Sequence, residues 1–402
     1  MRTKLSVFCE RIMEAGWLAA LILEPLFFNV YSSRVFEPDK LALLRSIALV
    51  LVATWIIKII EEAGHTEKPS VRAESGEKGQ ATRSPSLWQR LRRIPLAVPT
   101  LLLIAVYAVF TITSVAPRTS LWGSYQRLQG TYTTLSYIVI FAIILSALRR
   151  REQLERLILI AIVTSLPIAL YGLIQHYRLD PLPWGGDVTF RVASNMGNSI
   201  FVAAYMIMIV PLTLRNLIAA LSSVLQGEPP EIKGVFIGGY ALALLVQIVA
   251  WAKIGFAAGL LVGAVFTFII GLFAISMRKP LIRFLWIGAY SVILVAQLVC
   301  IFFTQSRGPW LGLLGGTFFF VLALAFAQRI RWLQWTSIGL AVVGGLFLIF
   351  LNMPGTPLDK IKNVPYIGRL GRIFETERGT GKVRVLIWEG VLQLMGFHEP
   401  IG

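Results

Sequence analysis

Residues 281–327 read LIRFLWIGAYSVILVAQLVCIFFTQSRGPWLGLLGGTFFFVLALAFA. Two mainly apolar runs, 281–303 and 308–327, lie on either side of a short polar sequence that ends at Arg307. A helix rises about 1.5 Å per residue, so about 20 apolar residues cross the roughly 30 Å hydrocarbon core of a bilayer. The stretch therefore predicts two membrane helices joined by a polar turn at one surface.

The same pattern recurs along the chain. A window of about 20 residues finds eleven apolar runs, which predicts an all-α, polytopic integral membrane protein with about 11 transmembrane helices. The expected spans are residues 12–31, 40–60, 95–115, 131–148, 157–177, 198–220, 234–252, 255–276, 281–303, 308–327 and 334–352. The two spans in 234–276 depend on a break at Lys253 and Gly255, and without that break every later helix would run in the opposite direction.

The composition excludes a water-soluble enzyme. Of the 402 residues 56% are hydrophobic and 15% are charged, whereas soluble domains carry about 25% charged residues. Only two cysteines occur: Cys9 precedes the first apolar run and Cys300 lies inside a late one. We therefore expect no disulfide framework.

The basic residues predict an orientation. With a cytoplasmic N-terminus, most of the 38 Lys and Arg residues fall on the cytoplasmic side, as the positive-inside bias requires. The net charge of +17 is therefore explained by topology, and no nucleic-acid partner is expected. The predicted parts are an N-terminal helix pair (1–60), a charged cytoplasmic linker (61–93), a main transmembrane domain (94–352) and the start of an extracytoplasmic loop (353–402), which we expect to continue beyond this chain.

Six of the arginines on the predicted outer side are site candidates, because the positive-inside bias disfavours arginine there. They are Arg118, Arg127, Arg178, Arg191, Arg307 and Arg384. A guanidinium matches phosphate oxygens bidentately, so such arginines suit a diphosphate. The alternative is that each contacts ordinary lipid phosphates. That alternative is favoured for Arg118 and Arg178, and both interpretations remain open for Arg307.

Other ionisable residues are scarce. No Asp or Glu occurs between Ile232 and Leu358, which disfavours an ion-coupled pump. Glu24 is expected to pair with Arg45 as a structural tie, and a catalytic or transport role is the less favoured alternative. Asp180 and Asp187 suit either a base for an acceptor hydroxyl or a turn, and the turn is favoured. His65, His176 and His398 have no metal-binding spacing, so no metal site and no cofactor are predicted.

Four stretches together resemble the O-antigen ligase and polymerase superfamily. They are Thr304–Gly312 with its Ser-Arg-Gly sequence, Gly123–Gly130, Arg191 followed by Gly197-Asn198, and Arg384–Trp388 ahead of Pro400-Ile-Gly402. The resemblance covers most of the chain after Ile94. Ser199 and Ile200 depart from the family pattern, so no role is carried over to Asn198.

This resemblance implies a glycosyltransferase of the bacterial plasma membrane, with the fold of the metal-independent membrane glycosyltransferases. Such an enzyme moves a glycan from undecaprenyl diphosphate to a lipid, glycan or protein acceptor on the outer face. It implies that Arg307 and Arg384 hold the diphosphate, and Arg191 and Arg127 are weaker candidates. The family histidine is expected beyond Gly402, and His398 does not match it.

The arginine chemistry favours an inverting, metal-independent transfer in which fixed cations stabilise the leaving diphosphate. Within the superfamily, a ligase, a polymerase and a protein O-oligosaccharyltransferase all remain open. The competing class is a non-enzymatic membrane protein, either a lipid-linked glycan flippase or an assembly scaffold. It is disfavoured because the charged residues gather at the outer ends of the helices.

Overall fold

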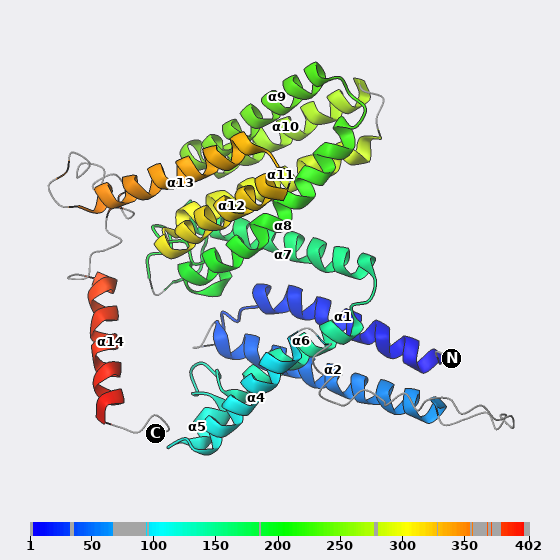
Figure 1. Cartoon of the computed structure of the whole chain (residues 1–402), viewed down its shortest axis with the longest axis vertical. Helices are drawn as coiled ribbons and strands as arrows, with labels where there is room; N and C mark the ends of the chain where they lie inside the picture. The colour runs from blue at the N-terminus through cyan, green and yellow to red at the C-terminus, as the bar shows by residue number, and fades with distance from the viewer. Residues whose placement is uncertain are drawn as a thin grey trace, which may run out of the picture. The chain divides into compact units, whose positions relative to one another are not determined.

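A computed structural model describes residues 3–32, 36–66, 94, 96–184, 186–276, 280–327, 329–353, 356, 368, 371 and 379–397. The side chains of residues 271, 273–276, 379–381 and 395–397 are not described. Within these residues the regular elements are all helical (Figure 1). Most of the predicted linker, His398 and the sequence Pro400–Gly402 lie outside the described residues.

Each of the eleven predicted spans has a helix within the described residues. These helices are α1 (Lys4–Leu26), α2 (Glu37–Thr66), α4 (Ala97–Ile112), α6 (Thr131–Ala147), α7 (Arg151–His176), α8 (Ser199–Leu225), α9 (Pro230–Val249), α10 (Phe256–Ser276), α11 (Leu281–Thr304), α12 (Arg307–Ala327) and α13 (Arg331–Asn352). Two further helices are the short α5 (Pro117–Trp122) and α14 (Gly379–Phe397).

The protein is a polytopic membrane protein, but the predicted count of eleven spans is not confirmed. Seven helices in the described part of the chain are long and apolar enough to cross a membrane, and α4, α6 and part of α10 are shorter apolar helices. The first predicted span, α1, does not meet this standard. Lys4, Glu10, Arg11, Glu14 and Glu24 interrupt its apolar composition.

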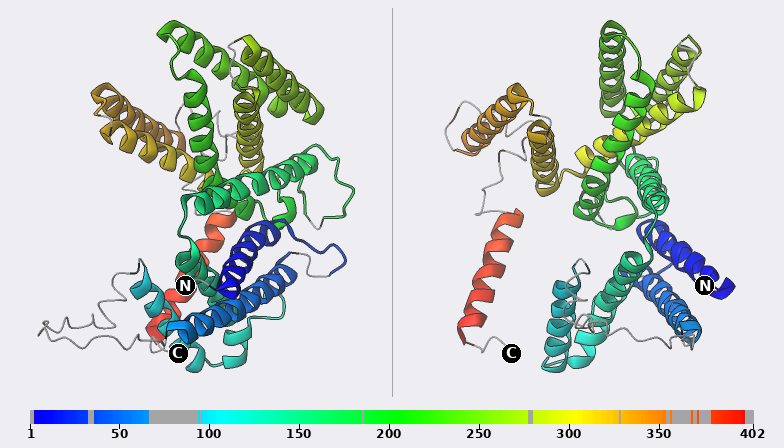
Figure 2. Two further views of the ribbon diagram at one scale, coloured as in Figure 1. Left: turned by 90° about the vertical axis from the view of Figure 1, so that its right-hand side faces the viewer. Right: turned by 45° about the vertical axis from the view of Figure 1, so that its right-hand side comes forward.

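The chain divides into two compact units, Met1–Leu157 with Leu392–Gly402, and Ile158–Val391. In unit 1 the helices α1, α2 and α6 pack together, and Figure 2 shows α1 and α2 as adjacent dark and mid-blue helices. Met13, Leu44 and Ile143 belong to its buried core. Lys58 of α2 forms an ion pair of 2.9 Å with Glu10 of α1, which joins the two helices at their predicted cytoplasmic ends.

Arg45 has a different role from the predicted one. It does not pair with Glu24, which instead interacts electrostatically with Lys40. Arg45 is only 8% exposed, and it donates to the carbonyl oxygens of Trp122 (2.8 Å) and Leu128 (2.6 Å). The predicted Glu24–Arg45 pair does not form because Arg45 donates to backbone carbonyl groups instead. A pattern of residue types does not reveal such acceptors.

In unit 2 the helix α11 is central and packs most extensively against α8. The Gln297 amide of α11 is fully buried and donates to Ser165 of α7 (2.7 Å) and Thr213 of α8 (3.0 Å). Such interhelical hydrogen bonds join helices where the apolar solvent gives little drive for association.

The expected break between α9 and α10 occurs at Gly255. A short π-helical turn, Ala250–Ile254, ends α9, and Gly255 then adopts φ +143°. Only glycine adopts this backbone region readily. The residues of 234–276 therefore form two adjacent helices (Figure 1).

Candidate functional site

The junction between α11 and α12 is tighter than the sequence suggested. Gln305 lies in the left-handed region with φ 51°, and α12 begins at Arg307. Arg307 is therefore the first residue of a helix and not part of a four-residue turn. The first N–H groups of a helix and its macrodipole favour an anion. A cationic side chain at this position adds to that preference.

The segment that carries Arg191 lies against the end of α11. The Val192 N–H donates to the Phe303 carbonyl (3.3 Å), and the Gln305 amide donates to the Phe190 carbonyl (2.6 Å). The Arg191 Nε is 3.5 Å from the Thr304 carbonyl oxygen. Carbonyl groups at a helix C-terminus lack partners within the helix. These contacts satisfy them and hold Arg191 close to the start of α12.

Arg191 and Arg307 influence each other electrostatically. Partial burial lowers the pKa of Arg191, and the positive charge of Arg307 lowers it further. A guanidinium remains charged at neutral pH despite such a shift. In the described part of the chain Arg191 forms no ion pair with a carboxylate. An anion between the two side chains would relieve their repulsion.

A buried glutamine fixes the backbone next to Arg191. Gln175, at the end of α7, is fully buried, and its amide oxygen accepts from the Ser194 N–H (2.7 Å) and the Ala193 N–H (3.3 Å). Ser194 has φ 47° and donates its hydroxyl to the Ile168 carbonyl. The position of Arg191 is therefore set by side chains of α7.

His176 is a site candidate that the sequence interpretation passed over. Its ring stacks on Phe303 with centroids 3.6 Å apart, and its Nδ1 is 2.8 Å from the Thr189 carbonyl oxygen. A carbonyl can only accept, so in the neutral ring Nδ1 carries the proton and Nε2 has a lone pair. Sequence spacing gave no signal, because His176 and Phe303 are far apart in the chain.

Both loop carboxylates form turns. Asp180 accepts from the Leu182 N–H, the Trp184 indole and the Tyr171 hydroxyl. Burial acts to raise the pKa of Asp180, but these hydrogen bonds outweigh it and hold the pKa below its usual value. The Thr189 hydroxyl bond and neighbouring N–H groups lower the pKa of Asp187 in the same way. Neither carboxylate therefore resembles a general base with a raised pKa.

The other predicted arginines have different surroundings. Arg127, in unit 1, is exposed and lies 3.8 Å from Glu37. Arg384 is exposed on α14, which packs extensively on no other helix among the described residues. Arg118 and Arg178 are exposed. Of the predicted site residues, Arg191 and Arg307 thus both lie at the junction of α11 and α12.

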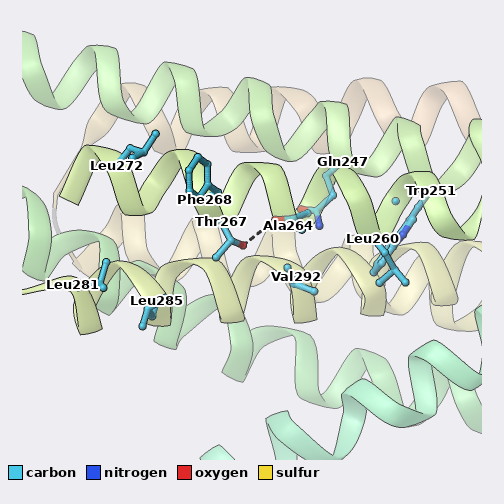
Figure 3. Close-up of a pocket in the computed structure, with 12 residues that line it drawn as sticks. Gln247, Trp251, Leu260, Ala264, Thr267, Phe268, Leu272, Leu281, Leu285 and Val292 are labelled. Carbon is cyan, nitrogen blue, oxygen red and sulfur yellow. Dashed lines mark hydrogen bonds between the residues drawn. The ribbon is translucent and has the colours of Figure 1, made fainter. Parts of the chain in front are cut away.

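An apolar groove of about 640 Å³ runs along α9, α10 and α11 in the same unit (Figure 3). Its lining extends from Gly259 to Leu272 on α10, a rise of about 20 Å. Trp251 is at one end, and its carbonyl accepts a hydrogen bond from the Tyr177 hydroxyl. Tyr177 contacts Phe303 edge-on, next to the arginine pair. The groove therefore ends near that pair.

Within the described residues no group of three or more His, Cys, Asp or Glu side chains has an arrangement that would hold a metal ion. The arrangement that does occur consists of two arginines at the junction of α11 and α12, a helix N-terminus and an apolar groove. These features define the protein as a multi-pass membrane protein with a cationic site at one end of its central helix.

Residues 292–402 match the family model described as O-antigen ligase. This part of the chain is an O-antigen ligase domain, and the resemblance to the O-antigen ligase and polymerase superfamily is confirmed. The match includes Arg307 and Arg384, while Arg127 and Arg191 precede it. The matched residues are similar to the O-antigen ligase-like and polymerase-like membrane glycosyltransferases. No curated protein and no solved structure matches the chain.

Proposed function

We propose that this protein transfers a glycan from undecaprenyl diphosphate to an acceptor on the outer face of the bacterial plasma membrane, as an O-antigen ligase does. The observation that carries the proposal is that Arg191 lies against the Thr304 carbonyl at the end of α11, three residues before Arg307 begins α12. Arg384 is assigned to the same diphosphate, and Arg127 is the weakest candidate. The proposed orientation has a cytoplasmic N-terminus.

The arginine pair suits the chemistry of this reaction. As the glycosidic bond to the diphosphate breaks, negative charge grows on the departing oxygen and the anomeric carbon becomes cation-like. Fixed cations beside the phosphates stabilise that transition state more than the ground state. The acceptor hydroxyl attacks from the opposite face, so the anomeric configuration inverts. Guanidinium groups supply the positive charge without a divalent metal.

The apolar groove is suited to bind the lipid part of the donor. It lies in the same unit as the arginine pair and ends at Trp251, which reaches Phe303 through Tyr177. A polyprenyl chain in the groove would leave its diphosphate near Arg191 and Arg307. The apolar lining provides hydrophobic contact along the membrane-buried length of the chain.

The test replaces Arg307 with lysine or alanine in the full-length protein in vesicles. Transfer of glycan from a lipid-linked donor is then measured. The lysine variant keeps the charge but loses the bidentate fork, so we expect about a 100-fold loss of transfer, and a larger loss with alanine. The matched control is Arg215→Lys, at an exposed arginine of α8 that bonds Asn216.

Full transfer by both Arg307 variants would contradict the proposal. A parallel assay follows the movement of fluorescent lipid-linked glycan between leaflets. Leaflet exchange without transfer in the wild-type protein would identify a flippase. The identity of the productive acceptor, whether lipid A, a second glycan or a protein, distinguishes a ligase from a polymerase or a protein O-oligosaccharyltransferase.

A further inference from the structure

A second cavity, of about 490 Å³, lies entirely within unit 1. It is bounded by the first turn of α2, the last turns of α4, the short helix α5 and the first turns of α6. In the predicted topology these helix ends share the outer side. The residues that line it are Leu41, Tyr107, Phe110, Thr111, Ser120, Gln129, Gly130, Thr131, Thr133, Thr134 and Tyr137.

The lining of this cavity is part polar and part apolar, and it contains no charged side chain. It combines hydroxyl groups and one amide with the aromatic rings of Tyr107, Phe110 and Tyr137. Within the described residues, Tyr107, Gln129 and Tyr137 are exposed and their side chains form no hydrogen bond to the protein, so their polar groups are available to a ligand. Hydroxyls and amides both donate and accept. A neutral ligand with many hydroxyl groups matches this combination.

One wall of the cavity is held rigidly. Arg45 binds the carbonyl groups of Trp122 and Leu128, donates to the Thr133 hydroxyl (2.9 Å) and lies over the Tyr132 ring. A Cβ atom on Gly130 would overlap the backbone of Gly123, so the two ends of this loop meet where neither position has space for a side chain. A preformed cavity lowers the entropic cost of binding.

We propose that this cavity binds a neutral sugar ring of a glycan substrate. The aromatic rings face the apolar C–H surface of the sugar, and the hydroxyl and amide groups bind its hydroxyls. The volume falls in the range of small-molecule sites. The inference rests on the proposed function for the source of the sugar, which belongs either to the lipid-linked donor or to a glycan acceptor.

The test measures binding of neutral sugars to the full-length protein in lipid nanodiscs, without glycoside detergents. The probe is a set of mono- and disaccharides built from glucose, galactose, rhamnose and N-acetylglucosamine, observed by saturation-transfer NMR. Tyr137→Phe and Gln129→Met each remove polar groups without an internal partner, so folding should be unaffected. We expect each to weaken binding about three- to tenfold.

The matched control is Thr113→Val, which removes a hydroxyl that bonds only within α4 and lies outside the cavity. Unchanged binding in the double variant Tyr137→Phe/Gln129→Met would overturn the inference, and so would the absence of sugar binding to the wild-type protein. Arg307→Ala should keep sugar binding, because the cavity lies in the other unit. Active transfer by Arg307→Ala would thus contradict the proposed function but would not contradict sugar binding in the cavity.

Transfer kinetics then identify the source of the sugar. If Tyr137→Phe raises the KM for the donor alone, the cavity binds the donor glycan. If it raises the KM for a glycan acceptor alone, the cavity binds the acceptor. A change in neither KM would overturn the assignment to a substrate.

Discussion

Two loops on the predicted outer side each carry a candidate arginine, and they are built in similar ways. Gly123–Gly130 in unit 1 is fixed by buried Arg45, and the Arg191 segment in unit 2 is fixed by buried Gln175. In both loops a polar side chain from a neighbouring helix binds the loop backbone. Buried polar groups of this kind specify one backbone conformation because leaving them unbonded is costly.

The two loops differ in the exposure and the charged neighbours of their arginines. Arg127 points to solvent and pairs with Glu37, so its charge is already compensated. Arg191 is half-buried beside Arg307, a like charge. Repulsion between two partly desolvated cations costs free energy in the absence of an anion. The second loop therefore has the stronger indication of an anionic ligand, and the first loop forms the wall of a neutral cavity.

The largest expected effect separates the two arginines directly. Arg191→Ala should lower kcat/KM for the lipid-linked donor about 30- to 100-fold, because it removes a cation from the diphosphate site. Arg127→Ala should change it less than about threefold, because Arg127 is exposed and paired. The vesicle transfer assay measures kcat/KM for both variants. The reverse order of effects would move the diphosphate site to unit 1.

An intermediate effect concerns the two buried side chains. Arg45→Met should leave the Trp122 and Leu128 carbonyl groups without partners and cost about 3 kcal/mol. Gln175→Leu should free the Ser194 N–H at a smaller cost, about 1–3 kcal/mol. Thermal unfolding in detergent measures both. Trypsin should then cut faster after Arg127 in the first variant and after Arg191 in the second, whereas Arg118→Met, an exposed control, should change neither rate.

The smallest effect is a pH dependence at Asp180 near the second loop. Its folded-state pKa lies below the ordinary value of 3.8, so its ionised form stabilises the fold. This contribution is complete above the ordinary pKa and is lost as pH falls through the lowered folded value. The melting temperature of Asp180→Asn should therefore be below that of the wild type at pH 7, and the gap should narrow near pH 3. A gap independent of pH would contradict the assignment.

Much of the fold was predictable because apolar run length controls membrane helices directly. The predicted span 281–303 differs from α11 by one residue, and the break at Gly255 was anticipated from one lysine and one glycine. The prediction is not confirmed for α1, whose charged residues place it below the standard of the seven spanning helices. Hydropathy alone did not show which helix becomes central. In the most apolar stretch of α11, 67% of the residues are buried inside the protein, whereas the corresponding share in α12 is 6%.

The candidate site was only partly predictable. Arg307 stood out because it interrupts two apolar runs, and Arg191 because it lies in an outer loop. Their proximity depends on Val192 and Gln305 binding across the end of α11. The roles of Gln175 and His176 had no sequence signal, because a buried glutamine and a helix-terminal histidine fit many environments. The pairing of Arg45 with loop carbonyls was likewise hidden, since every residue carries a carbonyl.

The sequence by itself determined that this chain is a bundle of membrane helices with an O-antigen ligase-type motif at the start of one of them. The physical reason is that lipid permits few backbone solutions, so length and hydropathy suffice. Only the tertiary structure decided which arginines meet, which loop is held by which buried side chain, and where the polar and apolar cavities lie. Those outcomes depend on contacts between residues far apart in the chain, and local composition does not encode such contacts.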